Sequence, residues 1–320
     1  MMELSIIVVN WKSVDFVLDC IESIHKTTRD VGYEIIVVDN ASGDDCCRIV
    51  SQAHPSVVVV GSERNIGFAR ANNLGAEKSK GEYLLFLNPD TVVLGEALKT
   101  MVARMRCTEH LGALGCRLLN RDLSLQTSCV QAFPNLTNQI LGVEWLRKRS
   151  PRLPLWGMRA LYASVHQDVF DVDAVSGACI MLRRDVFEQV GGFSTEYFMY
   201  AEEIDLCCKV RQAGWRVGYV PDAQIVHFGG ESSKKQRDVF ADIVMRDSVF
   251  KFMKKFRGAM YAWLYRAALL GSAMLRLVLL APLLLFPGKN RSHVRGMCKK
   301  WYKIGAWSLA QERWIADLGR

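Results

Sequence analysis

Proline is scarce in this sequence, and its first residues lack the features of an export signal. Only 8 of the 320 residues are Pro and 50% are hydrophobic, so we expect a globular chain rather than a disordered one. The opening MMELSIIVVNW has no basic n-region and no small-residue cleavage site. We therefore expect a buried strand there, and a protein of the cytoplasm.

Three common site motifs are also missing. The adjacent pairs Cys46–Cys47 and Cys207–Cys208 are not the spaced CxxC pairs of a zinc site. In a reducing compartment, all ten cysteines are expected to be unpaired thiols. Neither the P-loop pattern GxxxxGK[ST] nor the dinucleotide pattern GxGxxG follows the early strands, which excludes those two phosphate-binding loops.

What the sequence does contain is a regular alternation in its first hundred residues. Short apolar runs at 4–9, 34–38, 57–60 and 83–87 are typical of strands buried on both faces. Residues between them have helical spacing, as for Phe16, Cys20 and Ile24. About 25–30 residues separate successive runs, which is the size of a βαβ unit. The pattern predicts an α/β fold with a mostly parallel central sheet.

The second half is less regular at first. Prolines 134, 151 and 154 interrupt residues 120–170, which predicts a flexible or acceptor-facing insert. The pattern resumes at 173–184. It then predicts helices at about 185–190 and 202–213, and separate strands at 216–220 and 223–228.

Charge divides the chain unevenly. Residues 251–320 contain 14 Lys and Arg against 2 Asp and Glu, whereas residues 1–250 contain 27 against 31. We expect a catalytic α/β domain at 1–250 and a basic, apolar helical tail at 251–320. Such a tail is suited to a polyanion, either nucleic acid or an anionic membrane surface.

The tail begins with an apolar run at 260–286 that is long enough to cross a bilayer. Arg266 and Arg276 interrupt the run, and Pro282 would bend a helix. A monotopic helix or shallow hairpin therefore competes with a membrane span. A buried helix of a soluble domain is the third alternative.

Polar clusters follow the predicted strands, where ligands bind in open α/β sheets. Asp39-Asn40-Ala41-Ser42 could contact a nucleoside, or form an Asx turn or helix cap. The segment 65–75 opens a helix, and Arg70 could meet a phosphate there. A capped helix without a ligand explains the same residues.

Two further clusters contain acids. Asn88-Pro89-Asp90 offers oxygen ligands to a divalent cation, although the tripeptide is also common in turns. Glu202, Glu203 and Asp205 open a helix, where they either supply a general base or complement the helix dipole. His227, at the end of a predicted strand, is either a metal ligand or a structural residue.

Taken in order, these segments resemble family 2 glycosyltransferases of the GT-A fold, close to the rhamnosyltransferase-like branch. The resemblance covers about residues 1–235. The matching segments are SIIVVNW (5–11), EIIVVDNAS (34–42), NIGFARANNLG (65–75), YLLFLNPDT (83–91), SGACIMLRRDVFEQVGGF (176–193), YFMYAEEIDLCCKVRQAGW (197–215) and VHFGGES (226–232).

The resemblance implies a role for each cluster. Asp39 would contact the nucleoside, and Asn65 and Arg70 would line the nucleotide pocket. Asp90 would bind Mg²⁺ or Mn²⁺, with Asn88 in place of the first acid of the family's DxD motif and His227 as a later ligand. Glu203 would be the base, with Glu202 and Asp205 beside it. The remaining members of the expected nucleotide-sugar site, each within a matching segment, are Asn10, Asn40, Gly67 and Gly177.

The implied reaction is the inverting transfer of one sugar, with rhamnose as the candidate, from a nucleotide-diphosphate donor. A saccharide or polyprenyl-linked acceptor of cell-surface polysaccharide synthesis would receive it at the inner face of the cell membrane. The membrane attachment would be peripheral or monotopic, and no nucleic acid is expected as a partner. A non-catalytic sugar-binding module and a nucleic-acid-binding protein are the alternatives.

Two positions depart from the family pattern, and a motif of its processive members is incomplete. Glu203 replaces the usual Asp, which moves the base one methylene outward, and Lys209 stands where Arg is common. Gln311-Glu312-Arg313-Trp314 is one residue short of the QxxRW of processive synthases. This last departure favours one sugar per visit.

Overall fold

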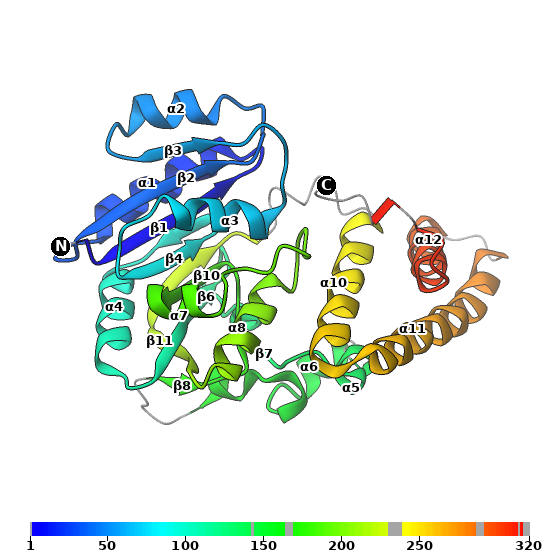
Figure 1. Ribbon diagram of the computed structural model, residues 1–320. Helices are drawn as coiled ribbons and strands as arrows, with labels where there is room; N and C mark the ends of the chain where they lie inside the picture. The colour runs from blue at the N-terminus through cyan, green and yellow to red at the C-terminus, as the bar shows by residue number, and fades with distance from the viewer. Residues whose placement is uncertain are drawn as a thin grey trace. The chain divides into compact units, whose positions relative to one another are not determined.

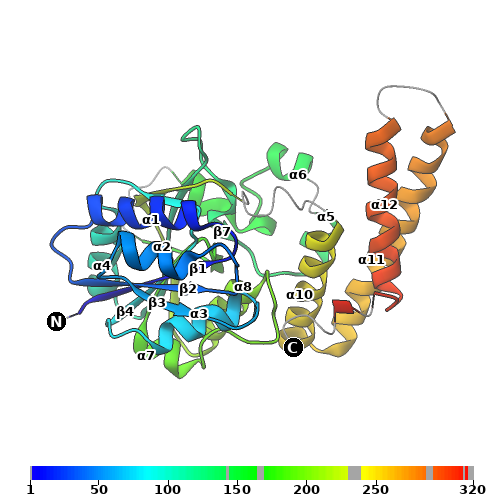
Figure 2. The ribbon, with the colours of Figure 1, turned by 90° about the horizontal axis from the view of Figure 1, so that it is seen from above.

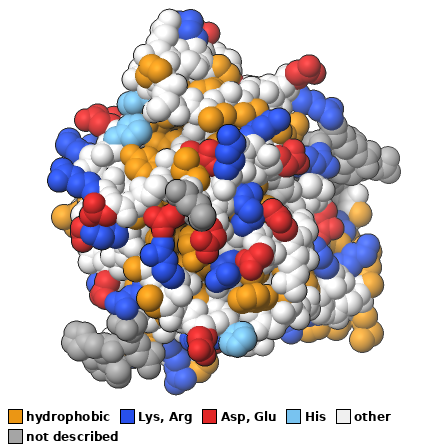
Figure 3. Space-filling model, turned by 60° about the vertical axis from the view of Figure 1, so that its left-hand side comes forward, with side chains coloured by type: hydrophobic (Ala, Val, Ile, Leu, Met, Phe, Trp, Pro, Cys, Tyr) orange, Lys and Arg blue, Asp and Glu red, His pale blue; other side chains and the backbone are white. Residues whose placement is uncertain are grey.

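The structure, a computed structural model, describes residues 2–141, 144–163, 169–229, 239–285, 291–312 and 314–315. The chain divides into two units. The larger contains Met1–Phe133, Ser150–Thr195 and Glu202–Lys234, and the smaller contains Pro134–Arg149, Glu196–Ala201 and Lys235–Arg320. The division expected at residue 250 falls inside helix α10 (Val239–Arg257). On the face drawn in Figure 3, acidic and basic side chains are interspersed.

A mixed sheet forms the centre of the larger unit (Figure 1). Among the described residues it has nine strands, in the order β3-β2-β1-β4-β10-β6-β11-β5, with β8 paired to β11. The strands are β1 (Leu4–Asn10), β2 (Tyr33–Asp39), β3 (Val58–Gly61), β4 (Tyr83–Leu87), β5 (Thr91–Val93), β6 (Leu111–Leu119), β8 (Phe170–Asp171), β10 (Cys179–Arg183) and β11 (Arg216–His227).

Most of the paired residues of the sheet lie in parallel ladders, as the sequence predicts. β1 pairs in parallel with β2 and β4, β2 with β3, and β6 with β11. β10 is antiparallel to β4 and β6, while β5 and β8 are antiparallel to β11. Every residue of β1 and of β4 is buried, which explains their continuous apolar sequences.

Helices of the larger unit bury the apolar stripes that their sequences carry. α1 (Val14–Thr27) buries Val17, Cys20, Ile21 and Ile24. α3 (Phe68–Glu77) packs on β1 and β2, and α4 (Ala97–Cys107) packs on β6 and β11. The other helices in the described part of this unit are α2 (Cys46–Ala53), α7 (Arg184–Gln189) and α8 (Glu202–Gln212).

One strand prediction is wrong. The strands expected at 216–220 and 223–228 are a single strand, β11, which runs from Arg216 to His227. Its register against β6 shifts between Val220 and Gln224. Pro221 lacks a backbone N–H and cannot join the ladder, so a bulge forms there and the strand continues beyond it.

The segment expected to be irregular contains only short elements in its described part. β7 (Val130–Gln131) pairs with β9 (Ala174–Val175) in a separate two-stranded sheet. Three 3₁₀ turns lie nearby, at Thr127–Cys129, Pro154–Trp156 and Met158–Tyr162. Trp156 and Met158 are buried, so this segment packs onto its surroundings.

The smaller unit is helical. α10 packs against α11 (Ala259–Leu280), which a 3₁₀ turn (Ala281–Leu285) extends, and α12 (Arg291–Ser308) runs back along α11 (Figure 2). α5 (Leu136–Leu141) and α6 (Glu144–Arg149) belong to the same unit. Its core contains Ile243, Val249, Met253, Ala262, Tyr265, Leu269, Trp307 and Ile315.

Candidate active site

The site residues predicted in the larger unit gather at one edge of the sheet. Asn10 at the end of β1 pairs with Asp39 at the end of β2. The parallel partner β4 ends at Leu87, directly before Asn88. β10 runs the other way, so its first residue, Cys179, lies opposite Leu87. The carboxyl ends of parallel strands thus bring together residues distant in sequence.

Asn10 organises the loop that follows Asp39. Its side chain is fully buried, and its amide donates to Asp39 at 3.2 Å, to Ser42 at 3.0 Å and to Asp44 at 3.0 Å. Its carbonyl oxygen accepts from the backbone N–H of Ser13 at 3.2 Å. The structure therefore places Asn10 beneath the expected nucleotide site, where it holds Asp39.

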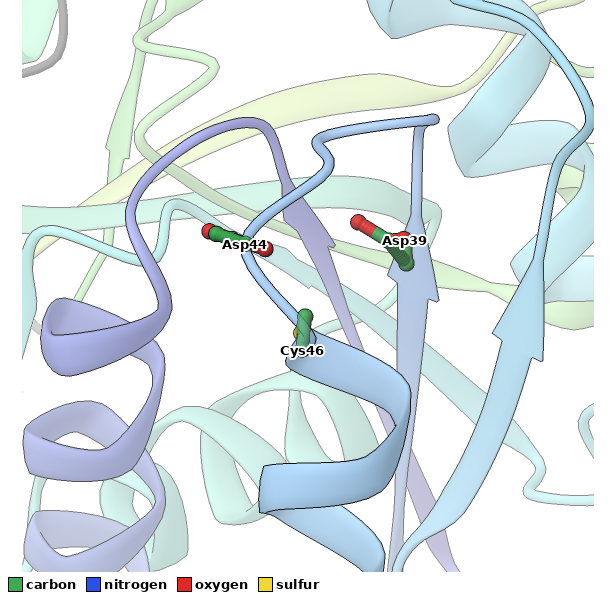
Figure 4. A group of neighbouring side chains, drawn as sticks. All are labelled: Asp39, Asp44 and Cys46. Atoms are coloured by element: carbon green, nitrogen blue, oxygen red, sulfur yellow. The ribbon is translucent and has the colours of Figure 1, made fainter.

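Asp39, Asp44 and Cys46 lie close enough to share a cation (Figure 4). However, both carboxylates accept hydrogen bonds from Asn10. Burial, with the nearby carboxylates of Asp39 and Asp44, raises the pKa of Cys46 to about 12, which keeps the thiol protonated. Burial alone would raise the pKa of Asp44. Hydrogen bonds from Ser42, Asn10 and the N–H of Val14 nevertheless lower it. The group forms a network that orients the Asp39 carboxylate.

A second network ties the end of β2 to the start of α3. Asn40 is buried, and its carbonyl oxygen accepts from the N–H of Ile66 at 2.9 Å. Its amide donates to Asn65 at 3.1 Å, and Asn65 in turn accepts from the N–H of Gly67 at 3.0 Å. Gly67 has a φ of 83°, which glycine adopts without strain.

Arg70 follows in the first turn of α3, where it is half-buried. The asparagine network thus fixes the helix start that the sequence assigns to phosphate recognition.

Asp90 and His227 meet because β5 and β11 are neighbours. The register places Thr91 opposite His227, and the N–H of Phe228 donates to the carbonyl of Asp90 at 2.9 Å. Asp90 Oδ1 then lies 3.4 Å from His227 Nε2, and Asn88 Nδ2 lies 3.4 Å from the same nitrogen. The three expected metal ligands are together.

Their spacing suits a divalent cation. Two ligand atoms about 2.1 Å from a cation, at adjacent octahedral positions, are about 3 Å apart, close to the 3.4 Å between Asp90 and His227. Asp90 is buried, with 4% of its surface exposed. The Asp90 carboxylate offers the oxygen donor that Mg²⁺ and Mn²⁺ prefer, and the His227 imidazole places a nitrogen beside it.

Glu202 and Glu203 occupy different environments at the start of α8. Glu202 is buried, and among the described side chains none donates to or accepts from its Oε2. Burial and the neighbouring Glu203 raise the pKa of Glu202 well above its usual value, so this carboxyl holds its proton more tightly than one in water.

Glu203 is half-buried, and its Oε1 accepts from Gln131 at 3.2 Å. Burial raises the pKa of Glu203, and the hydrogen bond from Gln131 opposes that increase. The hydrogen bond from Gln131 thus favours the ionised form of Glu203, and Oε2 of Glu202 has no such donor among the described residues.

Asp205 is bound within the protein by Ser194 and Lys209. It is completely buried, accepts from the Ser194 hydroxyl at 2.6 Å and pairs with Lys209 at 3.6 Å. Lys209 also donates to the carbonyl of Gly192. This arrangement anchors the first two turns of α8.

Gly177 lies between Glu203 and the segment that contains Asn88. A Cβ on Gly177 would lie 3.3 Å from Cβ of Glu203, so glycine allows the close approach. The next residue, Ala178, accepts from the N–H of Asn88 at 2.9 Å. Glu203 thus lies at the same edge of the sheet as Asn88 and Asp90.

Three residues were missed by the sequence reasoning. Gln126 accepts from His227 Nδ1 at 2.8 Å, and Gln131 donates to Glu203. Both lie in the irregular middle segment and in no matching motif, so the sequence carries no signal for them. Asp44 carried a weak signal, since it lies five residues after Asp39.

Several known proteins resemble this chain in sequence. N-acetylglucosaminyl-diphospho-decaprenol L-rhamnosyltransferase of Mycobacterium tuberculosis is 29% identical over 214 residues, which cover 62% of this chain and 67% of that protein. Rhamnosyltransferase WbbL of Escherichia coli is 27% identical over 236 residues, which cover 72% of this chain and 84% of that protein.

Solved structures share the fold. A mannosyltransferase from Pyrobaculum calidifontis, in complex with GDP-Man and Mn²⁺, superposes with a TM-score of 0.55 over 97% of this chain and 86% of that one, at 18% identity. The structure of GalNAc-T7 with UDP, GalNAc and Mn²⁺ superposes with a TM-score of 0.56 at 15% identity. The superposition covers 79% of this chain and 50% of that one. The GT-A fold expected from the sequence is confirmed.

The family is shown by the sequence itself. The profile described as glycosyl transferase family 2 matches residues 5–191, more than half of the chain. That range contains every expected nucleotide-binding residue, together with Asn88 and Asp90. The chain is therefore an enzyme of glycosyl transferase family 2.

Proposed function

We propose that this enzyme transfers one sugar, with inversion, from a nucleoside-diphosphate donor to a lipid-linked saccharide, and that the sugar is rhamnose. The observation that carries the proposal is the convergence of Asp90, His227 and Glu203 at one edge of the sheet. Asp90 lies 3.4 Å from His227. Glu203 is linked to Asn88 through Gly177 and Ala178.

Asp90, His227 and Asn88 would hold a divalent cation at the end of β4. When bound, the cation supplies positive charge that neutralises the leaving diphosphate. Asp39 and the start of α3 would bind the nucleoside and the phosphates, because Asp39 ends β2 and hydrogen bonds with the next residue, Asn40, hold the start of α3 beside it. Bound in this way, the donor would present its anomeric carbon to Glu203.

Glu203 would act as the base. Its deprotonated carboxylate accepts the proton of an acceptor hydroxyl, whose oxygen forms a bond to the anomeric carbon. The bond from that carbon to the diphosphate oxygen breaks in the same step, and the electron pair leaves with the diphosphate. Because Glu202 stays protonated beside it, the pair carries one negative charge, not two.

Relatives support the choice of sugar and acceptor. The two described above are named as rhamnosyltransferases, and one is named for a decaprenol-linked acceptor carrying N-acetylglucosamine. An O-antigen chain rhamnosyltransferase of Salmonella anatum is 24% identical over 196 residues. We infer a polyprenyl-diphosphate saccharide as acceptor, and a place at the cytoplasmic face of the membrane that contains it.

The test is a transfer assay with a panel of nucleoside-diphosphate sugars and a polyprenyl-diphosphate N-acetylglucosamine acceptor, with Mg²⁺ or Mn²⁺. We expect transfer from a nucleoside-diphosphate rhamnose and loss of transfer in Glu203→Gln. Transfer of a different sugar would overturn the rhamnose assignment, and equal activity of Glu203→Gln would overturn the role of the base. Activity retained in chelator without a cation would overturn the metal site.

A further inference from the structure

Helix α11 exposes one continuous apolar face. Its exposed large side chains, each with at least 51% of its surface accessible, are Met260, Trp263, Leu264, Met274, Leu275, Val278 and Leu279. Opposite them, Ala262, Tyr265, Leu269 and Ala273 are buried. Within the described residues, Ala259–Leu284 is the one stretch long and apolar enough to cross a membrane. A face of this size, left uncovered, calls for an apolar partner.

The two arginines of α11 do not lie on that face. The guanidinium of Arg266 is 4.6 Å from the ring of Trp307 and donates to the Trp307 carbonyl. Arg276 is 4.2 Å from the ring of Trp301 and donates to the Ser272 hydroxyl. Both arginine side chains are half-buried, because their guanidinium groups pack against tryptophans of α12. The charges that interrupt the apolar sequence therefore leave the exposed face uncharged.

Helix α12 adds a row of cations. Arg291, Arg295 and Lys299 are exposed and spaced four residues apart, so they share one side of the helix. Within the described part of the chain, no salt bridge engages these three. Lys300 and Lys303, by contrast, pair with Asp242 at 2.7 Å and with Glu312 at 2.8 Å. The free row fits a surface of negative charge.

The packing of α12 argues against a span. α12 runs along α11 in Figure 2 and is in contact with it, so a membrane-crossing α11 would carry α12 into the hydrocarbon. Each cation placed there is costly. A hairpin lying in the plane of the interface avoids this cost, because the apolar face meets the acyl chains while the cations stay at the headgroups.

We propose that α11 and α12 form an interfacial hairpin that binds an anionic lipid bilayer, with the exposed face of α11 in the acyl boundary and Arg291, Arg295 and Lys299 on the headgroups. A nucleic acid would not match the apolar face, and a second copy of the chain would carry the same row of cations. The hairpin specifies how the proposed enzyme reaches its lipid-linked acceptor, but binding itself requires no catalysis.

The experiment is flotation of the full chain with phosphatidylglycerol-containing vesicles and with phosphatidylcholine vesicles, without donor or acceptor. We expect the wild type to float with the anionic vesicles. Leu275→Glu/Val278→Glu should reduce binding to them at least tenfold. Leu123→Glu, which charges an equally exposed residue of the larger unit, should bind as the wild type does.

A second pair of variants tests the charge. Arg291→Gln/Arg295→Gln/Lys299→Gln should weaken binding to anionic vesicles by roughly 100-fold, from about 1 kcal/mol for each cation near the surface. The control replaces three exposed cations of the larger unit, Arg29→Gln/Arg64→Gln/Lys78→Gln, and should change binding little. All variants should retain sugar transfer to a water-soluble acceptor, which separates this proposal from the proposed reaction.

Four results would overturn the hairpin. The wild type could stay unbound with anionic vesicles, or the control variants could lose binding as much as the hairpin variants. Leu275→Glu/Val278→Glu could convert a dimer to a monomer without changing vesicle binding, which would make the face a contact between copies. Resistance of bound protein to alkaline carbonate would show a span instead of an interfacial helix.

Discussion

The side-chain amide of Gln126 holds His227 in one tautomer. Gln126 Nε2 donates to two acceptors, the Asn120 side chain at 3.2 Å and the His227 carbonyl at 3.3 Å, which fixes the orientation of the amide. Its Oε1 therefore accepts from Nδ1–H of His227 at 2.8 Å. In the neutral ring, Nε2 then carries the lone pair, and it is Nε2 that lies beside Asp90.

Replacing Gln126 should weaken metal binding. We expect Gln126→Ala to lower Mn²⁺ affinity about tenfold or more, because partners that orient a histidine ligand typically contribute 10- to 100-fold. Electron paramagnetic resonance of free Mn²⁺ in a titration measures this without turnover. Gln52→Ala, on the exposed side of α2, is the control. Unchanged affinity in Gln126→Ala would show that His227 needs no such support.

Asp90 is the carboxylate of the proposed cation site, so its charge should matter more than its shape. We expect Asp90→Asn to lower both Mn²⁺ affinity and kcat at least 100-fold, since a neutral amide binds a hard cation weakly. Asp122→Asn removes a carboxylate from an exposed turn and should leave both quantities unchanged. Full metal-dependent activity in Asp90→Asn would place the cation elsewhere.

Glu203→Gln should reduce kcat by roughly 10²- to 10⁴-fold, the usual contribution of a general base. The affinity for the donor, measured by calorimetry, should stay near the wild-type value, because Gln keeps the shape and the contact with Gln131. A parallel loss of donor affinity would show that Glu203 binds the substrate and does not act as the base.

The pH profile follows from the raised pKa of Glu203. A base works only when deprotonated, so kcat should fall as the pH drops below the pKa of this carboxyl. Burial raises that pKa above its ordinary value of 4.5. We therefore expect the acidic limb of the kcat profile above pH 4.5, measured at saturating donor and cation. A kcat that stays constant as the pH falls to 4.5 would contradict the assignment.

Glu202 makes the stability of the enzyme depend on pH. Its carboxyl keeps its proton more tightly in the folded state, where burial raises the pKa, than in the unfolded state. The unfolded state thus binds fewer protons, and stability falls as pH rises above 4.5. We expect Glu202→Gln to unfold at a higher temperature than the wild type near pH 8, and at a similar temperature near pH 4.5.

Thermal unfolding across that pH range measures the difference. The control is Glu63→Gln, because Glu63 is exposed and its replacement should shift the unfolding temperature equally at every pH. A gap between Glu202→Gln and the wild type that does not widen with pH would show that Glu202 is ionised in the folded enzyme.

Lys209 stabilises the helix that carries the acids. Lys209→Met should destabilise the fold by roughly 3 kcal/mol, because it removes the partner of the fully buried Asp205. Denaturant unfolding measures the free energy. Lys99→Met, which removes an exposed pair with Asp30, should change it little. If the two variants unfold alike, the pair at Asp205 contributes no more than a surface pair.

The elements of the larger unit follow closely from the sequence. β1 and β4 have continuous apolar sequences because both of their faces are covered, and α1 keeps its apolar residues on one side. Local patterns of this kind reflect the environment of each residue, so they can be read without knowing its partners. The bulge at Pro221 escaped the prediction because it depends on how β11 pairs with β6.

The sequence by itself determined the family and the residue types at the end of each strand. The tertiary structure decided which of those residues act together. Asp90 meets His227 only because β5 lies beside β11. Likewise, Arg266 and Arg276 lie away from the apolar face of α11, because their guanidinium groups pack on Trp307 and Trp301 of α12. Such contacts join residues far apart in the chain, and no local pattern encodes them.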